Sequence, residues 1–238
     1  MRDPEAVGER YSSGNLLIDS LPEPDRSRIA ARLEMFYPEV PDCVVSHGGH
    51  FEDVIFPIDS VFSVTAELRL GHVYEVAAIG RQGVIGAEVA FGVVTAPRSI
   101  MSQVGGSAAR MGCDVFGTCV RESAAFARAV QQHFVRRLFI AEQFVACNFA
   151  HDVTERCARW ILMLSDELGR DEFNLRKEFL GMMLGVEPDA AAAAAAHLQG
   201  TEAIRYAGER IALIDEDALR DIACECYEAQ RRYAPAAV

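Results

Sequence analysis

The sequence predicts an α+β fold: an N-terminal antiparallel β-roll of jelly-roll type, then one long helix, then a C-terminal winged helix-turn-helix. Three observations support this prediction. Between residues 40 and 114, short apolar runs alternate with Gly, Pro and Asp at roughly ten-residue intervals, which is typical of short antiparallel strands. Residues 121–149 contain neither Gly nor Pro, so a long helix can form there. After residue 174, two helical patterns and a hairpin pattern follow one another closely.

The N-terminal part divides into a tail and two short helices. Residues 1–13 are polar and charged without a period, and we expect a flexible tail. Residues 16–36 have apolar side chains at helical spacing on both sides of a Pro-Glu-Pro sequence, which predicts a helix, a turn and a second helix. Together with the strands, residues 14–120 are expected to form one domain.

Residues 121–150 are expected to form one long helix with more than one apolar side. Its main apolar row is Phe126, Val130, Phe134, Leu138, Ala141, Val145 and Phe149. A second row contains Val135, Phe139 and Phe144. A helix that is apolar on two sides must be covered on two sides. The β-roll can cover one, and a second copy of the chain across a two-fold axis can cover the other. The alternative is a helix buried within a monomer.

Residues 151–238 are expected to form the winged helix-turn-helix domain. A first helix follows His151 and Asp152, and a second ends at Gly185. A third can begin at Pro188, because proline suits the first turn of a helix, and it continues through seven alanines. Two alternating segments around residues 207–209 predict a two-stranded wing, and a final amphipathic helix closes the chain.

The segments LRKEFLGMMLGV, AIRYAGERIALID and CECY, in this order, resemble the C-terminal domain of the Crp/Fnr family of bacterial transcription regulators. The segments VYEVAAIGRQGVIGAEVAFG and PRSIMSQV resemble the effector-binding β-roll of that family. The resemblance covers about residues 14–233. It implies a homodimeric, effector-modulated, DNA-binding transcriptional regulator whose long helix is the dimer interface.

The resemblance also assigns candidate contacts to duplex DNA. The expected phosphate contacts are Arg176, Lys177, Arg205 and Arg210, which lie on the helix-turn-helix and the wing. The second helix of the motif usually enters the major groove. Its expected base contacts are Glu187, Asp189, Ala190, Ala191 and Ala192. This alanine-rich helix is atypical, because methyl groups can contact a thymine methyl but cannot donate the hydrogen bonds that read guanine or adenine.

The charge balance keeps an alternative open. Residues 151–238 contain ten Lys and Arg against seventeen Asp and Glu, a net charge of −7 out of −12 for the chain. Duplex DNA is held chiefly by cationic side chains that displace counterions from phosphates. The alternative is a degenerate family member that acts as a protein-interaction or small-molecule-sensing module, with weak or no DNA binding.

In cyclic-nucleotide-binding relatives, a Gly-Glu pair and an Arg-Ser pair about ten residues later hold the phosphate. The matching candidates here are Gly86, Glu88, Arg98 and Ser99, although Ala87 separates the glycine from the glutamate. Backbone N–H groups and a guanidinium suit a cyclic phosphate. A cyclic nucleotide is therefore one possible effector. In the other interpretation Arg98 is a surface or structural residue.

The sequence predicts neither a metal site nor an enzyme. On one helix, Cys224 and Cys226 would point about 200° apart, which is unsuitable for one shared ion. No cysteine precedes Cys43, so the N-terminal iron–sulfur cluster of oxygen-sensing relatives is not expected. A metal or haem at His47 and His50 is a further possibility, but we expect a solvated turn. No nucleophile elbow, phosphate loop or paired-carboxylate pattern is present.

The chain is expected to be cytoplasmic and not to associate with a membrane. No run of about eighteen apolar residues occurs, and the N-terminus lacks an apolar signal core. Seven cysteines, an odd number at irregular spacing, argue against a secreted disulfide framework and indicate a reducing compartment.

Overall fold

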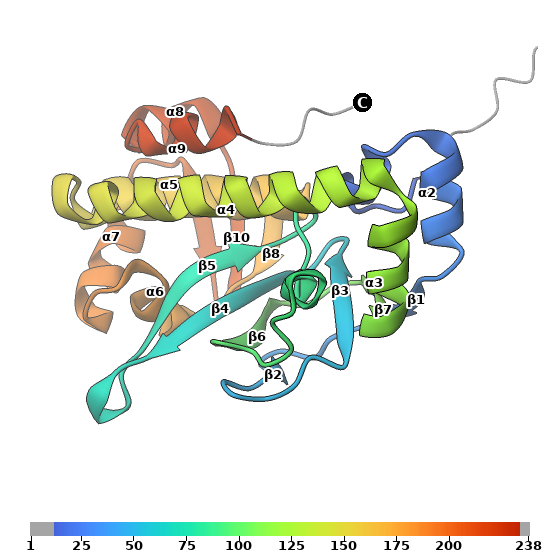
Figure 1. Ribbon diagram of the computed structural model, residues 1–238. Helices are drawn as coiled ribbons and strands as arrows, with labels where there is room; N and C mark the ends of the chain where they lie inside the picture. Colours follow the sequence, from blue (N-terminus) through green and yellow to red (C-terminus); the bar gives the residue numbers. More distant parts are fainter. Residues whose placement is uncertain (1–11, 234–238) are drawn as a thin grey trace, which may run out of the picture.

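The computed structural model describes residues 12–233, apart from the side chains of Leu70, Lys177 and Glu178. The long helix α4 (Ala124–Ala150) crosses the whole molecule. The N-terminal helices and the β-roll lie toward one end of α4, and the helix-turn-helix lies toward the other (Figure 1). This arrangement confirms the predicted α+β fold and the order of its parts.

Two short helices, α1 (Leu16–Asp19) and α2 (Glu23–Ala30), precede the roll as predicted, but the second is shorter than expected because residues 34–36 form a strand. Asn15 caps α1 and is buried, because its side-chain amide also donates to the carbonyl oxygens of Pro57 and Gly83. Most of the predicted tail lies outside the described residues.

The β-roll consists of two antiparallel sheets. Its strands are β1 (Glu34–Phe36), β2 (Cys43–Val45), β3 (Asp53–Pro57), β4 (Val61–Glu67), β5 (Val73–Ile79), β6 (Ser99–Val104) and β7 (Ala108–Gly112). They form the sheets β1-β7-β3 and β2-β6-β4-β5. Two short 3₁₀ helices lie in the connections between strands: η1 (Arg69–Gly71) between β4 and β5, and η2 (Ala87–Phe91) between β5 and β6. Phe56 and Phe62 are fully buried, one in each of two neighbouring clusters of the roll core.

The predicted long helix over residues 121–150 is found as α4, which begins three residues later than expected and follows an unpredicted helix. The helix α3 (Cys113–Glu122) begins in a segment whose sequence predicts a strand, and α4 follows after a break at Ser123. The Ser123 hydroxyl accepts a hydrogen bond from the Phe126 N–H at 3.1 Å, which caps α4. Serine is a strong helix cap, so a segment without Gly or Pro can still be divided at this residue.

The C-terminal domain contains the predicted helix-turn-helix and wing. Its elements are α5 (Val153–Leu168), β8 (Glu172–Asn174), α6 (Lys177–Leu184), α7 (Pro188–Gly200), β9 (Ile204–Ala207), β10 (Arg210–Leu213), α8 (Glu216–Ile222) and α9 (Cys226–Arg231). Asp152 and Glu155 form a capping box that begins α5. The strand β8 was not predicted; it pairs with β10 and makes the wing a three-stranded sheet, β8-β10-β9.

The chain's last predicted helix is also divided. We expected one helix over residues 216–233, but Ala223 has an extended conformation (φ −66°, ψ 146°) that ends α8. After the break, α9 packs against α4 and α5, and the buried Tyr227 hydroxyl donates to the Asp166 carboxylate at 2.9 Å. This contact requires a change of direction that the amphipathic pattern does not reveal.

The roll and the C-terminal domain share a buried polar contact. The Trp160 indole N–H on α5 donates to Glu75 on β5 at 3.1 Å. Glu75 also accepts from the Ser63 hydroxyl and the Gln103 amide, and burial raises the pKa of its carboxyl group. Val61 of the roll lies in the same apolar cluster as Trp160. The two domains therefore pack as one body in this structure.

None of the described helices combines the length and the hydrophobicity needed to cross a lipid bilayer.

Candidate nucleic-acid interface and effector cavity

The helix-turn-helix is formed by α6 and α7 with a turn at Gly185. Gly185 has φ +65°, a left-handed conformation that glycine adopts without strain and that ends α6. Pro188 occupies the first turn of α7, as its fixed φ angle favours. The sequence pattern correctly located both helices.

The alanine run of α7 has an inner and an outer face. The inner face consists of Ala191, Ala194, Ala195 and Leu198, which are buried against α5 and α6. The outer face consists of the exposed residues Asp189, Ala190, Ala192, Ala193, Ala196 and His197. Ala191 is only 1% exposed, so its prediction as a base contact is wrong. Seven alanines have identical side chains, and only their helical phase decides which ones face outward.

The acidic residues at the start of α7 are accessible. Glu187 is the N-cap residue and Asp189 lies in the first turn, and both are exposed. The Glu187 side chain makes no capping hydrogen bond to the helix backbone. Carboxylates at this position interact favourably with the helix dipole and can accept a hydrogen bond from the cytosine amino group.

The candidate phosphate-binding arginines differ in their surroundings. Arg176 forms an ion pair with Glu209 at 3.4 Å, and Arg210 forms one with Glu172. Arg205 on β9 is exposed and makes no ion pair with any residue that the structure describes. The Lys177 side chain lies outside the described part of the chain. Exposed ion pairs contribute about 0–1 kcal/mol, so a phosphate can compete with Glu209 and Glu172 for these arginines.

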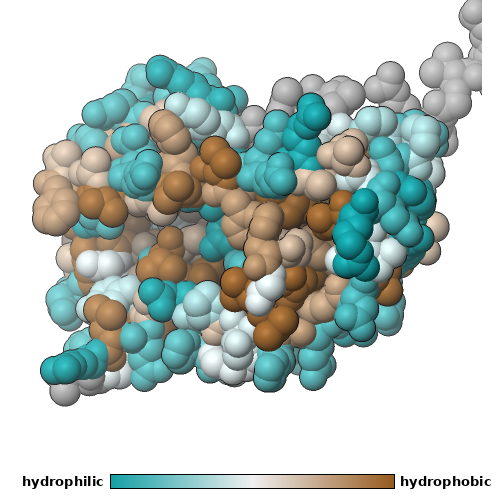
Figure 2. All heavy atoms as spheres, viewed as in Figure 1, coloured by the Kyte–Doolittle hydropathy of each residue, from teal (hydrophilic) through white to brown (hydrophobic). Residues whose placement is uncertain are grey.

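The apolar row of α4 changes its surroundings along the helix. Phe126 and Val130 are buried beneath the roll, whereas Phe149 is 90% exposed. Figure 2 shows hydrophobic surface along α4 and in the hollow beneath it. The exposed large apolar residues of α4 are Val135, Leu138, Phe139, Val145 and Phe149. All of these except Phe139 follow steps of three, seven and four residues, a spacing that repeats every 3.5 residues.

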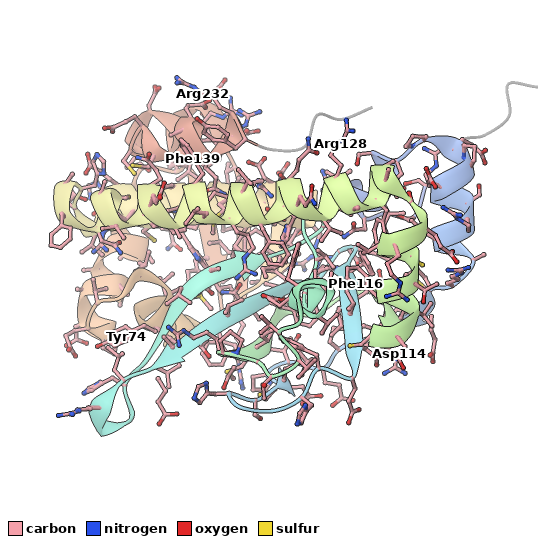
Figure 3. The ribbon with its side chains drawn as sticks, in the orientation of Figure 1. Tyr74, Asp114, Phe116, Arg128, Phe139 and Arg232 are labelled. Atoms are coloured by element: carbon pink, nitrogen blue, oxygen red, sulfur yellow. The ribbon has the colours of Figure 1, made fainter. Side chains whose placement is uncertain are left out.

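Phe139 follows Val135 by one helical turn, but an aromatic neighbour within the protomer already covers part of it. Its ring is 4.0 Å, centroid to centroid, from the ring of Tyr233 at the end of the described chain. Figure 3 shows Phe139 where α4 passes the C-terminal helices. We therefore define the α4 seam as Val135, Leu138, Val145 and Phe149.

A cavity of about 420 Å³ lies between β5, α4 and the C-terminal domain. Its polar lining is Glu88, Arg98, His133, Arg136, Arg137, Glu167 and Gln230. Two of the four predicted effector residues, Glu88 and Arg98, therefore line one cavity. Gly86 and Ser99 are not part of its lining; the Ser99 hydroxyl instead accepts a hydrogen bond from the His47 N–H.

Charged groups from three elements meet in this cavity. Glu88 of η2 pairs with Arg137 of α4 at 3.2 Å, and Arg136 pairs with Glu167 of α5 at 3.3 Å. His133 is buried, and apart from an interaction with the Val84 backbone its ring nitrogens have no hydrogen-bond partner among the described residues. Burial and the nearby charges of Arg137 and Arg136 lower the pKa of His133 to about 3. A buried polar group that lacks a full set of partners within the protein can be satisfied by a bound water, ion or ligand.

Sequence reasoning missed His133, Arg136, Arg137 and Glu167. The segment HFVRR at residues 133–137 does carry a signal, because it places three polar side chains on the apolar helix α4. The helical pattern alone indicates packing and does not reveal which cavity these groups face.

The prediction that Cys224 and Cys226 cannot share an ion is wrong. It assumed one continuous helix, but Cys224 lies in the break between α8 and α9. The thiols of Cys147, Cys224 and Cys226 and a ring nitrogen of His151 all lie within 4.8 Å of one another. The fold therefore brings together four side chains that could bind a metal ion and that are far apart in the sequence.

Comparisons with known proteins agree with this architecture. Residues 155–222 match the family model of the Crp-like helix-turn-helix domain. No curated protein matches the chain significantly in sequence.

Several solved structures have the same fold. FixK2 from Bradyrhizobium japonicum is 15% identical, with a TM-score of 0.69 over 81% of this chain and 98% of that one. A CRP-family transcriptional regulator from Thermus thermophilus is 15% identical, with a TM-score of 0.64 over 80% and 96%. The c-di-GMP responsive global regulator CLP from Xanthomonas campestris is 17% identical, with a TM-score of 0.63 over 81% and 99%. The chain thus has the fold of Crp/Fnr-family transcription regulators, and residues 155–222 are its Crp-like helix-turn-helix domain.

Proposed function

We propose that this protein is a homodimeric DNA-binding transcriptional regulator whose DNA affinity depends on a small-molecule effector. The observation that carries the proposal is the exposed outer face of α7, held on a Crp-like helix-turn-helix domain. A second helix with a free outer face is the element that enters the major groove in such domains. Nothing in the chain's described part covers this face.

The α4 seam supports a homodimer. Four large apolar side chains, each at least 60% exposed, recur with the 3.5-residue spacing of a two-helix contact. Two copies of α4 related by a two-fold axis would bury the same seam on both protomers. This symmetry would also place two copies of α7 on one side of the dimer, as successive major grooves require.

Contacts to DNA would be of two kinds. Arg205, with Arg176 and Arg210 after exchange of their glutamate partners, would bind phosphates. Ala190, Ala192 and Ala193 would present methyl groups to thymine methyls, and Glu187 and Asp189 would accept hydrogen bonds from cytosine amino groups. Such contacts give modest discrimination between bases, so sequence-dependent DNA shape would carry part of the specificity.

The cavity supports control by an anionic effector. Arg98 belongs to the roll, Arg136 and Arg137 to α4, and Glu167 and Gln230 to the C-terminal domain. A ligand bound there would contact all three parts. If it bound one placement of the helix-turn-helix more tightly than another, it would favour that placement. Guanidinium groups bind phosphate in a bidentate manner, so a cyclic mononucleotide or dinucleotide fits the lining.

Calorimetry tests the effector proposal. Titration of cyclic mononucleotides and dinucleotides should give heat with the wild-type protein and at least about tenfold weaker binding with Arg98→Ala. Arg28→Ala, on α2 and outside the cavity, should leave the affinity unchanged. Equal affinity in the wild type and in Arg98→Ala would exclude this cavity as the site.

Fluorescence anisotropy with duplex DNA tests the DNA-binding proposal. Binding at about micromolar protein should weaken with salt, with a logarithmic slope of about −0.9 for each phosphate contacted. A flat salt dependence, or no binding at low salt with or without a bound effector, would contradict it.

The second candidate is a protein-interaction module with the same architecture and without DNA binding. It is favoured by the acidic C-terminal domain and by the ion pairs that already engage Arg176 and Arg210. The same anisotropy experiment separates the two functions, because this candidate predicts no DNA binding under any condition of the assay.

A further inference from the structure

The end of α4 and the C-terminal segment bring together four side chains that can bind a metal ion. Cys147 lies in the last turn of α4, and His151, four residues later, follows its end. Cys224 lies between α8 and α9, and Cys226 is the first residue of α9. Cys147 contacts Cys224, and His151 contacts Cys226, so both side chains lie beside the C-terminal cysteines.

The distances among these atoms match those of a single tetrahedral ion. The Cys147 and Cys224 sulfurs are 3.6 Å apart, and the Cys226 sulfur is 3.7 Å from His151 Nδ1. Zinc–sulfur bonds of about 2.3 Å in a tetrahedron place two sulfurs about 3.8 Å apart. All four ligand atoms lie within 4.8 Å of one another, which suits one ion.

The site is closed to solvent. Cys147 is 0%, Cys226 1% and Cys224 4% exposed, and the three form a small cluster of their own. The His151 side chain is 14% exposed. Four protein ligands in a closed site are the arrangement of structural zinc centres, whereas catalytic zinc keeps a position open for water.

Neighbouring groups orient the ligands. The Glu225 carboxylate lies 3.0 Å from His151 Nε2, which leaves Nδ1 directed at Cys226. Metal-binding histidines commonly have such a carboxylate on the other ring nitrogen. The Gln143 amide donates to the Cys226 sulfur at 3.1 Å. The guanidinium of Arg159 is buried, and its charge acts on Cys147 and Cys224. Three thiolates and one zinc ion together carry a net negative charge, which this guanidinium would offset.

We propose that Cys147, His151, Cys224 and Cys226 form a structural Zn²⁺ site that fixes the DNA-binding domain to the end of α4. Soft thiolates with one imidazole in tetrahedral geometry select zinc among the common cellular metals. Cys147 and Cys224 are separated by 77 residues, which include α5, the helix-turn-helix and the wing. The ion would therefore hold both ends of the C-terminal domain beside its junction with α4 at Asp152.

Metal analysis of the untagged full-length protein tests the site. Elemental analysis after gel filtration should give about one zinc per protomer. Cys224→Ser and Cys226→Ser should each lower this to less than about one fifth, and the control Cys43→Ser, at an exposed cysteine of the roll, should retain full zinc.

A second set of variants separates metal loss from misfolding. His151→Cys keeps four ligands and should retain zinc, whereas His151→Ala should lose it, with circular dichroism checking that both fold. Cobalt added to the zinc-free wild type should give the thiolate charge-transfer and tetrahedral ligand-field bands. Less than about one fifth of an equivalent of zinc in the wild type, stoichiometric iron instead, or a Cys147–Cys224 disulfide in the intact mass would overturn the assignment.

Discussion

Replacing Phe149 tests the α4 seam with the least disturbance to the protomer. The side chain is 90% exposed at the end of α4, so Phe149→Ala removes almost no contact within one protomer. Burial of a phenylalanine side chain contributes about 1.5–3 kcal/mol. If the partner covers the exposed part of the side chain, a symmetric dimer loses this contribution twice, or about 3–6 kcal/mol in total.

The expected result is a dimer dissociation constant that rises about 10²- to 10⁴-fold, because each 1.4 kcal/mol corresponds to a factor of about ten. Sedimentation equilibrium over a range of concentrations measures it. Tyr37→Ala provides a control, because Tyr37 is 74% exposed but follows β1, away from α4. A dissociation constant for Phe149→Ala within about threefold of the wild type would refute the assignment of the seam.

Three further predictions concern the wing, the cavity and the contact between α4 and the roll. Arg205→Ala should reduce the magnitude of the logarithmic salt slope of DNA binding by about one, because one phosphate contact is lost. The control Arg28→Ala should leave the slope unchanged. An unchanged slope for Arg205→Ala in salt-dependent anisotropy would exclude Arg205 as a phosphate contact. The depressed pKa of His133 means that the unfolded chain binds a proton between pH 6.5 and about 3 that the folded chain does not, so the free energy of unfolding decreases as the pH is lowered through this window. Urea unfolding should show His133→Gln losing about 2 kcal/mol less than the wild type between about pH 7 and pH 5, and equal losses would contradict the burial argument. Gly83→Ala should lower the free energy of unfolding by about 1–3 kcal/mol, because the new Cβ would lie 2.8 Å from the His133 ring. The control Gly117→Ala lies within α3, where the new Cβ would meet only Arg121 Nη1 at 3.4 Å. It should be neutral or stabilising in the same assay.

The elements with strong local signals could be predicted from the sequence. Gly185 and Pro188 mark the turn of the helix-turn-helix, and both helices are found on the expected sides of it. The wing follows from two alternating segments around Gly208. In each case, the residues that determine the conformation are adjacent in the chain.

Features that depend on tertiary contacts could not be predicted in this way. The helix α3 occupies a segment whose sequence predicts a strand, and Ala223 is extended in a segment with good helical periodicity. The break at Ala223 brings Cys224 beside Cys147, so the spacing of the cysteines in the sequence could not predict the metal-ligand cluster. Periodicity also cannot distinguish Ala190 from Ala191, because alanine offers no pattern that identifies the buried face.

Selection of bound fragments from the source genome by the full-length protein tests directly whether α7 reads DNA. We expect enrichment of a two-fold symmetric sequence with half-sites about one helical turn, or about 10 base pairs, apart, because two copies of α7 would enter successive major grooves. Loss of this enrichment in Arg205→Ala would show that binding of the selected fragments depends on the wing. Recovery of random fragments, or of no fragments with or without a bound effector, would contradict the assignment of α7 as a DNA-reading helix.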